Sequence, residues 1–342
     1  MPEILPFLKQ LLSLPGLSSQ EAPVRRVIAE AWRPLVDEMH VSRTGSLQAL
    51  RRGVGPQPRP SLLLAAHMDA IGLMVTSVVG EFLHVTSIGG VDPRVLPGQL
   101  VTVYGRRELP GVMVQPPAFM LPPGVGSGVL PMDRLLVDTG LEAAELAKLV
   151  RVGDLVAYAQ PPVMLGDDVV AGHTLDDRAA VAAVTACLQN LQGRQTAWDL
   201  WAVATVQEET GLIGGLTSAY GLRPALAVAI DVTFASGPGS PEHSTYPFGK
   251  GLTLGWGPNI HPALFKAFKE VAERFEIPYK EEVMPGNSGT DAAGMQIAAE
   301  GIPSMVIGIP LRYMHTPVEV VSLKDIERTG RLLAEFTASL AP

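Results

Sequence analysis

Four short apolar runs, none with the polar alternation of a half-exposed strand, constrain the fold of this chain most strongly. They are SLLLAAH (61–67), DLWAVATV (199–206), ALAVAIDV (225–232) and IPSMVIGI (302–309). Such runs are typical of strands buried on both faces of a parallel sheet. Helical patterns lie between them, at 176–192, 261–275 and 291–300. Strands that alternate with helices predict an α/β fold, a three-layer mixed sheet flanked by helices.

The middle of the chain, residues 70–165, has a different pattern. It is rich in Val, Gly and Pro, and turn signals separate its short β-like stretches, GLMVTSVV, EFLHVTSIG, QLVTVYG, PGVMVQ and DLVAYAQ. Only residues 141–149 carry a helical pattern. This predicts a small β-barrel or sandwich inserted into the α/β fold. We therefore expect a discontinuous catalytic domain of residues 1–69 and 166–342, with an inserted barrel domain at 70–165.

The start of the chain and its composition narrow the class of protein. Residues 4–39 have helical spacing, broken at Pro15-Gly16, and predict two helices. The formal charge of −8 argues against a nucleic-acid partner. The first residues do not resemble a signal peptide, and no apolar run reaches the roughly 18 residues that span a bilayer, so we expect a soluble cytoplasmic protein. Cys187, the only cysteine, is expected to be a buried apolar residue.

Each apolar run leads to acidic or histidine side chains. In open α/β folds, ligands bind at the edge of the sheet where the carboxyl ends of the strands meet. The candidate residues at these ends are His67 and Asp69, then Glu208 and Glu209, then Asp231, and finally His315. The sequence therefore predicts that these side chains, contributed by four separate strands, form one site.

Each candidate alone has a simpler explanation. His67 and Asp69 share one face of a strand, which suits a metal ligand with an orienting acid but also an ordinary surface pair. Glu208 and Glu209 could both be solvated in a loop. Asp176 opens a helical pattern, where an aspartate usually caps the first turn. Convergence at one edge favours a shared function over these separate explanations.

The charge of the predicted site favours metal ions. Asp176, Glu208, Glu209 and Asp231 at one edge would repel one another and take up protons unless cations were present. Three carboxylates and two imidazoles form the mixed oxygen and nitrogen set that zinc accepts. Two divalent cations make a shared water acidic enough to ionise near neutral pH, and Glu208 could then act as general base. The residues therefore predict metal-assisted hydrolysis of an amide bond.

Six segments carry a resemblance to a known family. They are AAHMDAIGLMV, TLDDRAAVAA, VQEETGLIGG, AIDVTFA, GNSGTDA and RYMHTPVEVVSLKDIE, in this order along the chain. They resemble the tetrahedral (TET) aminopeptidases, dinuclear metallopeptidases that include glutamyl and deblocking aminopeptidases and some members labelled endoglucanase. The resemblance spans nearly the whole chain and implies a metallo-aminopeptidase that acts on short peptides.

The resemblance also implies a role for each site residue. Five residues match the metal ligands of the family: His67 and Asp231 for one ion, Glu209 and His315 for the other, and Asp176 as the bridge between them. Glu208 matches the general acid/base, and Asp69 matches the acid that orients it. The two ions would be Zn²⁺ or Co²⁺, with Mn²⁺ as a further choice.

Further properties follow from the same resemblance. The peptide bond after the bridging aspartate, here Asp176-Asp177, is often cis in this family. The inserted barrel would form dimers, which assemble into a hollow tetrahedral dodecamer. The chain departs from the family pattern at Ala70, where glutamate is usual, and at Ala180, where glycine is usual. Residues 115–119 replace a Lys-Pro-Pro-His-Leu stretch, which could alter assembly or access to the site.

Other functions remain open on the sequence. An endoglucanase-type glycoside hydrolase would need two carboxylates about 5–5.5 Å apart, but not two histidines and further acids. An inactive homologue with a role in assembly or binding would be marked by loss of a ligand or of Glu208, and all are present. Only the family resemblance disfavours a carboxypeptidase or dipeptidase with a related two-metal core.

The remaining polar candidates are less specific. His173 is expected to be structural, and Asp291 is either a helix cap or a substrate contact. Arg312 and Tyr313 either meet the substrate or shape the turn before His315. Lys250 is the only lysine near the expected rim of the pocket, among aromatic and leucine side chains. We therefore expect a preference for neutral or hydrophobic N-terminal residues.

Overall fold

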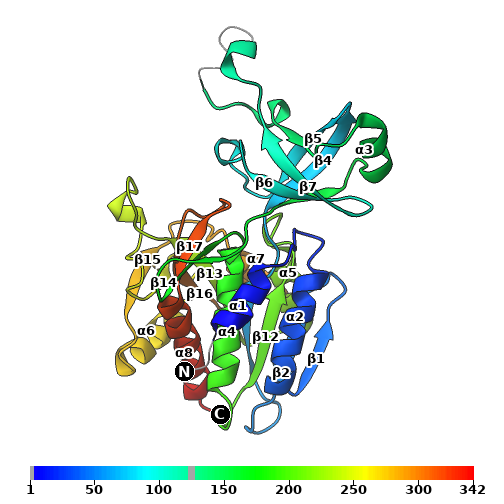
Figure 1. Cartoon of the computed structure of the whole chain (residues 1–342). Coiled ribbons are helices and arrows are strands. Elements are labelled where there is room, and N and C mark those ends of the chain that lie inside the picture. Colours follow the sequence, from blue (N-terminus) through cyan, green and yellow to red (C-terminus); the bar gives the residue numbers. More distant parts are fainter. Residues whose placement is uncertain (1–3, 122–127) are drawn as a thin grey trace.

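The core of the fold is a mixed sheet in which the four apolar runs are neighbours. The computed structural model describes residues 4–121 and 128–342. Within them the sheet has eleven strands, in the order β1-β2-β12-β3-β13-β16-β17-β11-β10, with β14 beside β16 and β15 beside β14 (Figure 1). The predicted strands are β3 (Ser61–His67), β12 (Asp199–Thr205), β13 (Leu226–Phe234) and β16 (Ser304–Arg312). They pair in parallel and are buried, which confirms the prediction.

Helices cover both faces of this sheet, so the predicted three-layer α/β fold is confirmed (Figure 1). One face carries α1 (Leu5–Leu12), α2 (Ala22–Trp32), α4 (Leu175–Asn190), α6 (Pro262–Arg274) and α8 (Leu323–Ser339). The other face carries α5 (Ile213–Leu222) and α7 (Asp291–Gln296). Helix α4 lies between the sheet and other helices, and it is apolar all round, as such a position requires. Cys187 on α4 is buried, as predicted.

Among the helices of residues 4–121 and 128–342, none combines the length and apolar character that a membrane-spanning helix needs.

The sequence analysis missed elements at the margins of the sheet. They are β1 (Glu38–Val41), β2 (Leu47–Arg51), β10 (Val163–Met164), β11 (Val169–Gly172), β14 (Leu252–Trp256), β15 (Tyr279–Val283) and β17 (Glu319–Ser322), together with helices α5 and α8. Strands β1 and β15 have exposed residues and therefore no apolar run. Three glycines obscure the helical pattern of α5. The two helices predicted within 4–39 are present as α1 and α2, but α2 ends earlier than predicted, at Trp32 just before Pro34. Helix α7 likewise ends earlier, at Gln296.

The inserted segment is a closed barrel with the strand order β4-β5-β8-β7-β6-β9. Its strands are β4 (Gly72–Val79), β5 (Phe82–Ile88), β6 (Leu100–Tyr104), β7 (Glu108–Val114), β8 (Leu136–Asp138) and β9 (Leu155–Tyr158). All five predicted stretches are strands, whereas β8 is too short to have a pattern. The predicted helix is α3 (Ala143–Leu149). Leu73, Val103 and Val156 belong to a second apolar core inside the barrel.

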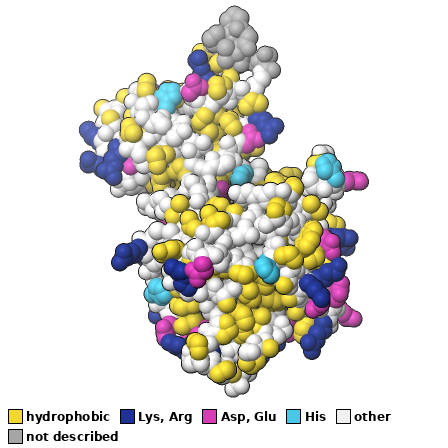
Figure 2. Space-filling model, turned by 180° about the vertical axis from the view of Figure 1, so that it is seen from behind, with side chains coloured by type: hydrophobic (Ala, Val, Ile, Leu, Met, Phe, Trp, Pro, Cys, Tyr) yellow, Lys and Arg dark blue, Asp and Glu magenta, His cyan; other side chains and the backbone are white. Residues whose placement is uncertain are grey.

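The barrel forms a lobe of its own, and the surface is hollowed between it and the α/β lobe when the molecule is seen from behind (Figure 2). The predicted boundary after residue 165 lies just beyond β10, which pairs with β11 in the large sheet. The division at 69/70 and 165/166 stays a prediction.

A buried arginine ties the start of the chain to the helix that carries Asp176. Arg178 is fully buried, and its guanidinium donates to the carbonyl oxygens of Leu11, Leu14 and Pro15 at 2.6, 2.7 and 2.9 Å. A side chain at Gly16 would collide with this guanidinium, since a Cβ there would lie 2.6 Å from Nη2. The break between the two predicted helices is therefore the place where Arg178 fixes the first turn of α4.

Candidate active site

The register of the sheet brings the predicted site residues to one edge. His67, the last residue of β3, is level with Thr205 of β12. On the other side of β3, Ala65 is level with Ala229 of β13. Asp231 is two residues further along β13, so it reaches the edge of the sheet at the level of His67. The strand ends therefore converge as the sequence predicted.

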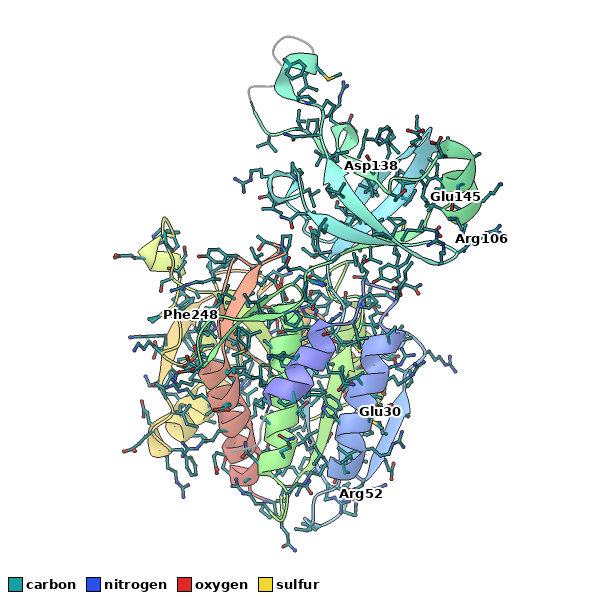
Figure 3. All side chains as sticks on the ribbon, in the orientation of Figure 1. Glu30, Arg52, Arg106, Asp138, Glu145 and Phe248 are labelled. Atoms are coloured by element: carbon teal, nitrogen blue, oxygen red, sulfur yellow. The ribbon has the colours of Figure 1, made fainter. Side chains whose placement is uncertain are left out.

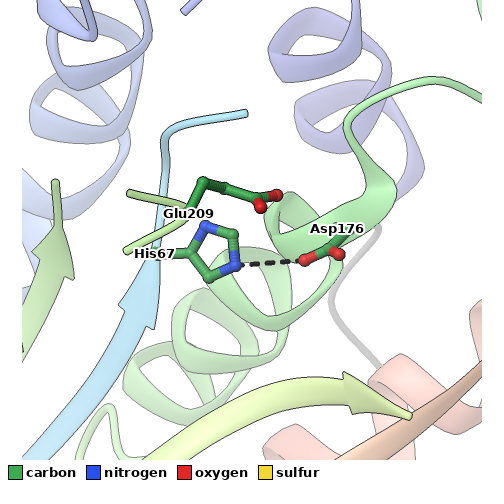
Figure 4. A group of neighbouring side chains, drawn as sticks. All are labelled: His67, Asp176 and Glu209. Carbon is green, nitrogen blue, oxygen red and sulfur yellow. Dashed lines mark hydrogen bonds and ion pairs between the residues drawn. The ribbon is translucent and has the colours of Figure 1, made fainter. Parts of the chain in front are cut away.

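Asp176 faces both imidazoles of the site. Its Oδ1 lies 3.0 Å from Nε2 of His67, and its Oδ2 lies 3.3 Å from Nε2 of His315. Glu209 also approaches His315, with its Oε2 at 3.5 Å from the same Nε2. Figure 4 shows the His67 ring pointing at Asp176, with Glu209 beside both. The peptide bond between Asp176 and Asp177 is cis, as the family resemblance implied.

Asp231 and Glu208 complete the group. Oδ1 of Asp231 and Oε2 of Glu208 each lie 3.9 Å from Nε2 of His67. A cavity of about 610 Å³ is lined by the five predicted metal ligands and by Glu208. The structure thus brings the predicted residues together, while their individual roles stay predictions.

Asp69 lies behind this group and contacts two members of it. It is fully buried, and its Oδ1 accepts a hydrogen bond from the backbone N–H of Glu208 at 3.0 Å. The same oxygen lies 3.6 Å from Nδ1 of His67. Its Oδ2 accepts from the hydroxyl of Ser18 at 2.6 Å. Asp69 therefore fixes the backbone of Glu208 rather than touching its carboxylate.

The carboxylates of the site fit divalent cations. Buried Oε1 atoms of Glu208 and Glu209 and the buried Oδ1 of Asp177 have no hydrogen-bond partner among the described residues. Buried polar atoms are nearly always paired, so these oxygens indicate a partner other than the protein. Two sets of three side chains have ligand atoms within 4.8 Å of one another: His67, Asp176 and Glu209, and His67, Asp177 and Asp231. Such a mixed oxygen and nitrogen set is one that zinc accepts.

The pKa values of the site acids also indicate that the site binds cations. Burial raises the pKa of Glu208 to about 10 and that of Glu209 to about 8. Burial also raises the pKa of Asp231 well above its ordinary value, and nearby acids add to the shift. By themselves, these groups therefore hold protons near neutral pH. A bound cation would have to displace those protons.

The imidazoles are shifted in the same direction. The hydrogen bond to Asp176 raises the pKa of His315 to about 9. Burial lowers the pKa of His67, but its hydrogen bonds with Asp176 and Asp69 outweigh burial and hold it well above the ordinary value. Without metal, each imidazole is therefore protonated and positively charged among the acids. Metal ions bound at the site would replace that positive charge.

Glu319 is a part of the site that the sequence analysis missed. It is buried, and its two oxygens accept hydrogen bonds from the backbone N–H groups of Asp176 and His315, each at 3.0 Å. His315 has a φ of 62°, a left-handed conformation that is unfavourable for a residue other than glycine. One carboxylate therefore fixes the backbone at two predicted ligands. The available signal was an acid inside the apolar strand VEVV.

Two further buried acids also hold backbone at the site. Asp177 accepts from the backbone N–H of His67 at 3.2 Å through Oδ2. Asp291 accepts from the hydroxyl of Thr205 at 2.5 Å and from the N–H of Gly215 at 3.1 Å. Asp291 therefore joins β12 to α5, which is neither the helix cap nor the substrate contact considered from the sequence. The cap of α7 is Thr290.

The barrel contributes part of the wall of the site. Residues Gly89 and Gly90 follow β5 and pack on two predicted ligands. A Cβ at Gly89 would lie 3.2 Å from Oε2 of Glu209, and one at Gly90 would lie 2.5 Å from Nδ1 of His315. Only glycine allows the barrel backbone to approach His315 this closely.

The other polar candidates have structural contacts. His173 is buried, lies 6.1 Å edge-on to the ring of Tyr158, and has its pKa lowered to about 3 by burial. Nε of Arg312 donates to the carbonyl oxygen of Ser236 at 2.8 Å, and its guanidinium lies 4.3 Å above the ring of Phe248. Figure 3 labels Phe248 on the α/β lobe, remote from Arg106, Asp138 and Glu145 on the barrel. Arg312 thus shapes the loop that follows β13.

Known proteins are similar to this chain in fold and sequence over nearly their whole length. The family model of the M42 glutamyl aminopeptidases matches residues 45–332. The lysyl aminopeptidase of Pyrococcus furiosus is 34% identical over 342 residues, which cover 98% of this chain and 97% of that protein. The solved TET aminopeptidase of a marine sediment archaeon of the Thaumarchaeota has a TM-score of 0.93 at 31% identity, covering 98% and 96% of the two chains.

A third relative is the TET1 peptidase of Pyrococcus horikoshii, which can assemble into a tetrahedron or a large octahedral shell. Its structure has a TM-score of 0.86 at 28% identity and covers 99% of this chain and 100% of its own.

In fold and in sequence the chain therefore matches aminopeptidases, which are hydrolases of peptide bonds. The chain belongs to the M42 glutamyl aminopeptidase family, which confirms the resemblance found in its sequence. Peptidases of this family are metal-dependent, and the described residues include candidate groups for binding metal.

The contacts of Glu319 predict an effect on metal affinity. Replacing it in Glu319→Gln leaves an amide NH₂ against a backbone N–H, so the backbone at Asp176 or His315 loses its acceptor. Changes of this kind next to metal ligands reduce affinity roughly 10- to 100-fold. Zn²⁺ titration by calorimetry checks this, with Glu300→Gln as the control because Glu300 is exposed. An affinity within about twofold of the unchanged protein contradicts the role given to Glu319.

The raised pKa values predict how pH affects the stability of metal-stripped protein. Glu208 and Glu209 keep protons in the folded state up to about pH 10 and 8, whereas the unfolded chain releases them near their model value of 4.5. His315 likewise keeps its proton up to about pH 9. The folded state binds more protons, so its stability falls as the pH rises from about 6 to 9.

Thermal unfolding after chelation measures this slope. The Glu208→Gln, Glu209→Gln double variant should flatten it, since glutamine does not titrate. A melting temperature of the stripped protein that rises over this range contradicts the prediction.

Proposed function

We propose that this chain is a dinuclear metal-dependent aminopeptidase that removes the N-terminal residue of short peptides. The observation that carries the proposal is the cluster of buried acids and imidazoles around one cavity, whose inner carboxylate oxygens lack protein partners among the described residues. The sequence similarity to aminopeptidases over nearly the whole chain supports the same reaction.

The geometry supports a division of the ligands between two cations. In this assignment His67 and Asp231 hold one ion, Glu209 and His315 hold the other, and Asp176 is shared, because its two oxygens face the two imidazoles. Zn²⁺ or Co²⁺ suits this donor set, and Mn²⁺ is a further choice. When bound, the two ions supply the positive charge that acidifies a water and polarises the substrate carbonyl.

Glu208 is the proposed general base and acid. Its Oε2 lies 3.9 Å from His67 at the edge of the cavity, and its other oxygen has no protein partner in the described part of the chain. It takes a proton from the attacking water and returns it to the leaving amine. Asp69 acts as a positioning residue, since it holds the backbone N–H of Glu208. Burial alone favours the protonated form of Glu208. The positive charge of bound cations would lower its pKa and so allow it to act as a base near neutral pH.

A glycoside hydrolase of endoglucanase type explains less of the site. Two carboxylates suffice for that reaction, which leaves the two imidazoles and the additional acids without a purpose. A role in assembly or binding alone would likewise not require the buried, unpaired oxygen of Glu208. We therefore retain the peptidase reaction.

We also propose that the protein is a homo-oligomer, with dimers that assemble into a dodecamer. The TET1 peptidase of Pyrococcus horikoshii assembles into closed shells. On the barrel of this chain, Leu100, Phe119, Met120 and Val129 are exposed, and Phe119 is 87% exposed. Large exposed apolar side chains of this kind often mark interfaces between proteins. A cytoplasmic location remains a prediction from the sequence.

Light scattering after size exclusion tests the assembly. The expected particle has twelve times the chain mass of 36.3 kDa. A single species with the mass of one chain, at a concentration of about 10 μM or above, contradicts the proposal.

The proposed base predicts the behaviour of Glu208→Gln. The variant should retain bound metal, because Glu208 is not one of the proposed ligands. Its kcat should fall on the order of 10² to 10⁴-fold, since the proton has no acceptor. Elemental analysis and turnover of aminoacyl substrates measure the two quantities. Turnover close to that of the unchanged enzyme would refute the assignment, and chelation that leaves hydrolysis intact would refute the metal dependence.

A further inference from the structure

One carboxylate in the cavity has no part in the proposed chemistry. Glu282 lies on the edge strand β15 and lines the same cavity as Asp231. Its Oε1 accepts from the hydroxyl of Thr233 on β13 at 2.6 Å, and its Oε2 accepts from the hydroxyl of Thr253 on β14 at 2.5 Å. The side chain therefore does not point to solvent from the sheet edge but lies over the strands next to the site.

Glycine makes this position possible. Gly308 of β16 is level with Asp231 on one side and with Thr253 on the other. A Cβ at Gly308 would lie 2.2 Å from Oγ1 of Thr253 and 2.9 Å from Oε2 of Glu282. The space that a side chain would fill above β16 is thus occupied by the Thr253 hydroxyl and the Glu282 carboxylate that accepts from it.

This carboxylate has no cationic partner within the described residues. Its neighbour Glu281, which points the other way, forms an ion pair with Lys269 at 3.0 Å. No ion pair in the described part of the chain includes Glu282, and no lysine or arginine lines the cavity. Burial raises the pKa of Glu282, while the two threonine hydroxyls lower it. A bound cation would stabilise the ionised carboxylate of Glu282, which has no positively charged side chain beside it among the described residues.

The lining and the distances fit a long cationic side chain. Thr233 follows Asp231 by two residues on the same face of β13, a rise of roughly 7 Å along the strand, and its hydroxyl donates to Glu282. A spacing of this size is within reach of the four-carbon stem of lysine. Val306 and Met284 also line the cavity, so the stem would pack on apolar surface. A carboxylate has about four acceptor positions, of which the threonines use two.

We propose that Glu282 selects substrates whose N-terminal residue is lysine or arginine, by accepting charge-assisted hydrogen bonds from the side-chain cation. This rests on the aminopeptidase function proposed for the cavity. It replaces the preference for neutral or hydrophobic residues expected from the sequence, because the isolated strand YKEEV gives no sign that Glu282 enters the site.

The first experiment compares lysyl, arginyl, leucyl and glutamyl p-nitroanilides with metal-loaded enzyme. The expected result is the highest kcat/KM for lysyl or arginyl substrates. Glu282→Gln should lower kcat/KM for these two by roughly 10- to 100-fold, since a hydrogen bond to a charged group is lost, and leave leucyl hydrolysis nearly unchanged. The matched control is Glu281→Gln, the exposed neighbouring acid, which should change neither.

The second measurement does not depend on the folding of a variant. L-lysinamide and L-norleucinamide have stems of the same length and differ in the terminal cation, so they are compared as competitive inhibitors of the unchanged enzyme. Lysinamide should bind at least about tenfold more tightly.

Three outcomes are distinguishable. A preference for leucyl substrates with equal or weaker binding of lysinamide overturns the inference and leaves the peptidase function intact. An equal loss on all substrates in Glu282→Gln assigns Glu282 a structural role and also overturns it. Failure to hydrolyse any of the four substrates with metal present contradicts the proposed function itself.

Discussion

Mutual repulsion of buried acids is the constraint on which the rest of the structure depends. Asp176, Glu208, Glu209 and Asp231 lie around two imidazoles at one end of the sheet, where they line a cavity and are mostly shielded from bulk water. Such a group is stable only if protons or cations balance its charge. The raised pKa values of its members express this requirement. These groups are held together, despite their repulsion, by buried strands, a buried helix and a buried arginine.

The backbone around the site is held mainly by other acids. Asp69, Asp177 and Glu319 each accept at least one backbone N–H of a site residue, and Asp291 accepts that of Gly215 on α5. Backbone N–H groups are fixed donors, and a carboxylate that accepts them is locked in orientation. The site therefore has an inner ring of acids that face the cavity and an outer ring that faces the backbone. The outer ring makes the inner ring rigid without adding cationic side chains that would compete with metal.

The layered fold could be predicted because its strands are continuous apolar runs, and the site because charged residues follow those runs directly. His67, Glu208 and Asp231 were visible for this reason. Glu319 and Glu282 could not be assigned to the site, since the sequence around an acid inside a strand does not show which distant residues it contacts. The position of Glu282 depends on Gly308 and on two threonines of other strands. The alternation of side chains along a strand does not show that one of them lies over the neighbouring strand.

The contact between the barrel and the site has a consequence for how such a chain can vary. Gly90 belongs to the barrel loop between β5 and β6, yet the space where its side chain would stand is taken by the ring of His315. The barrel and the α/β lobe are therefore in direct contact at this point and are not joined only by a linker. A barrel from another protein could replace this one only if it kept a glycine at the position of Gly90.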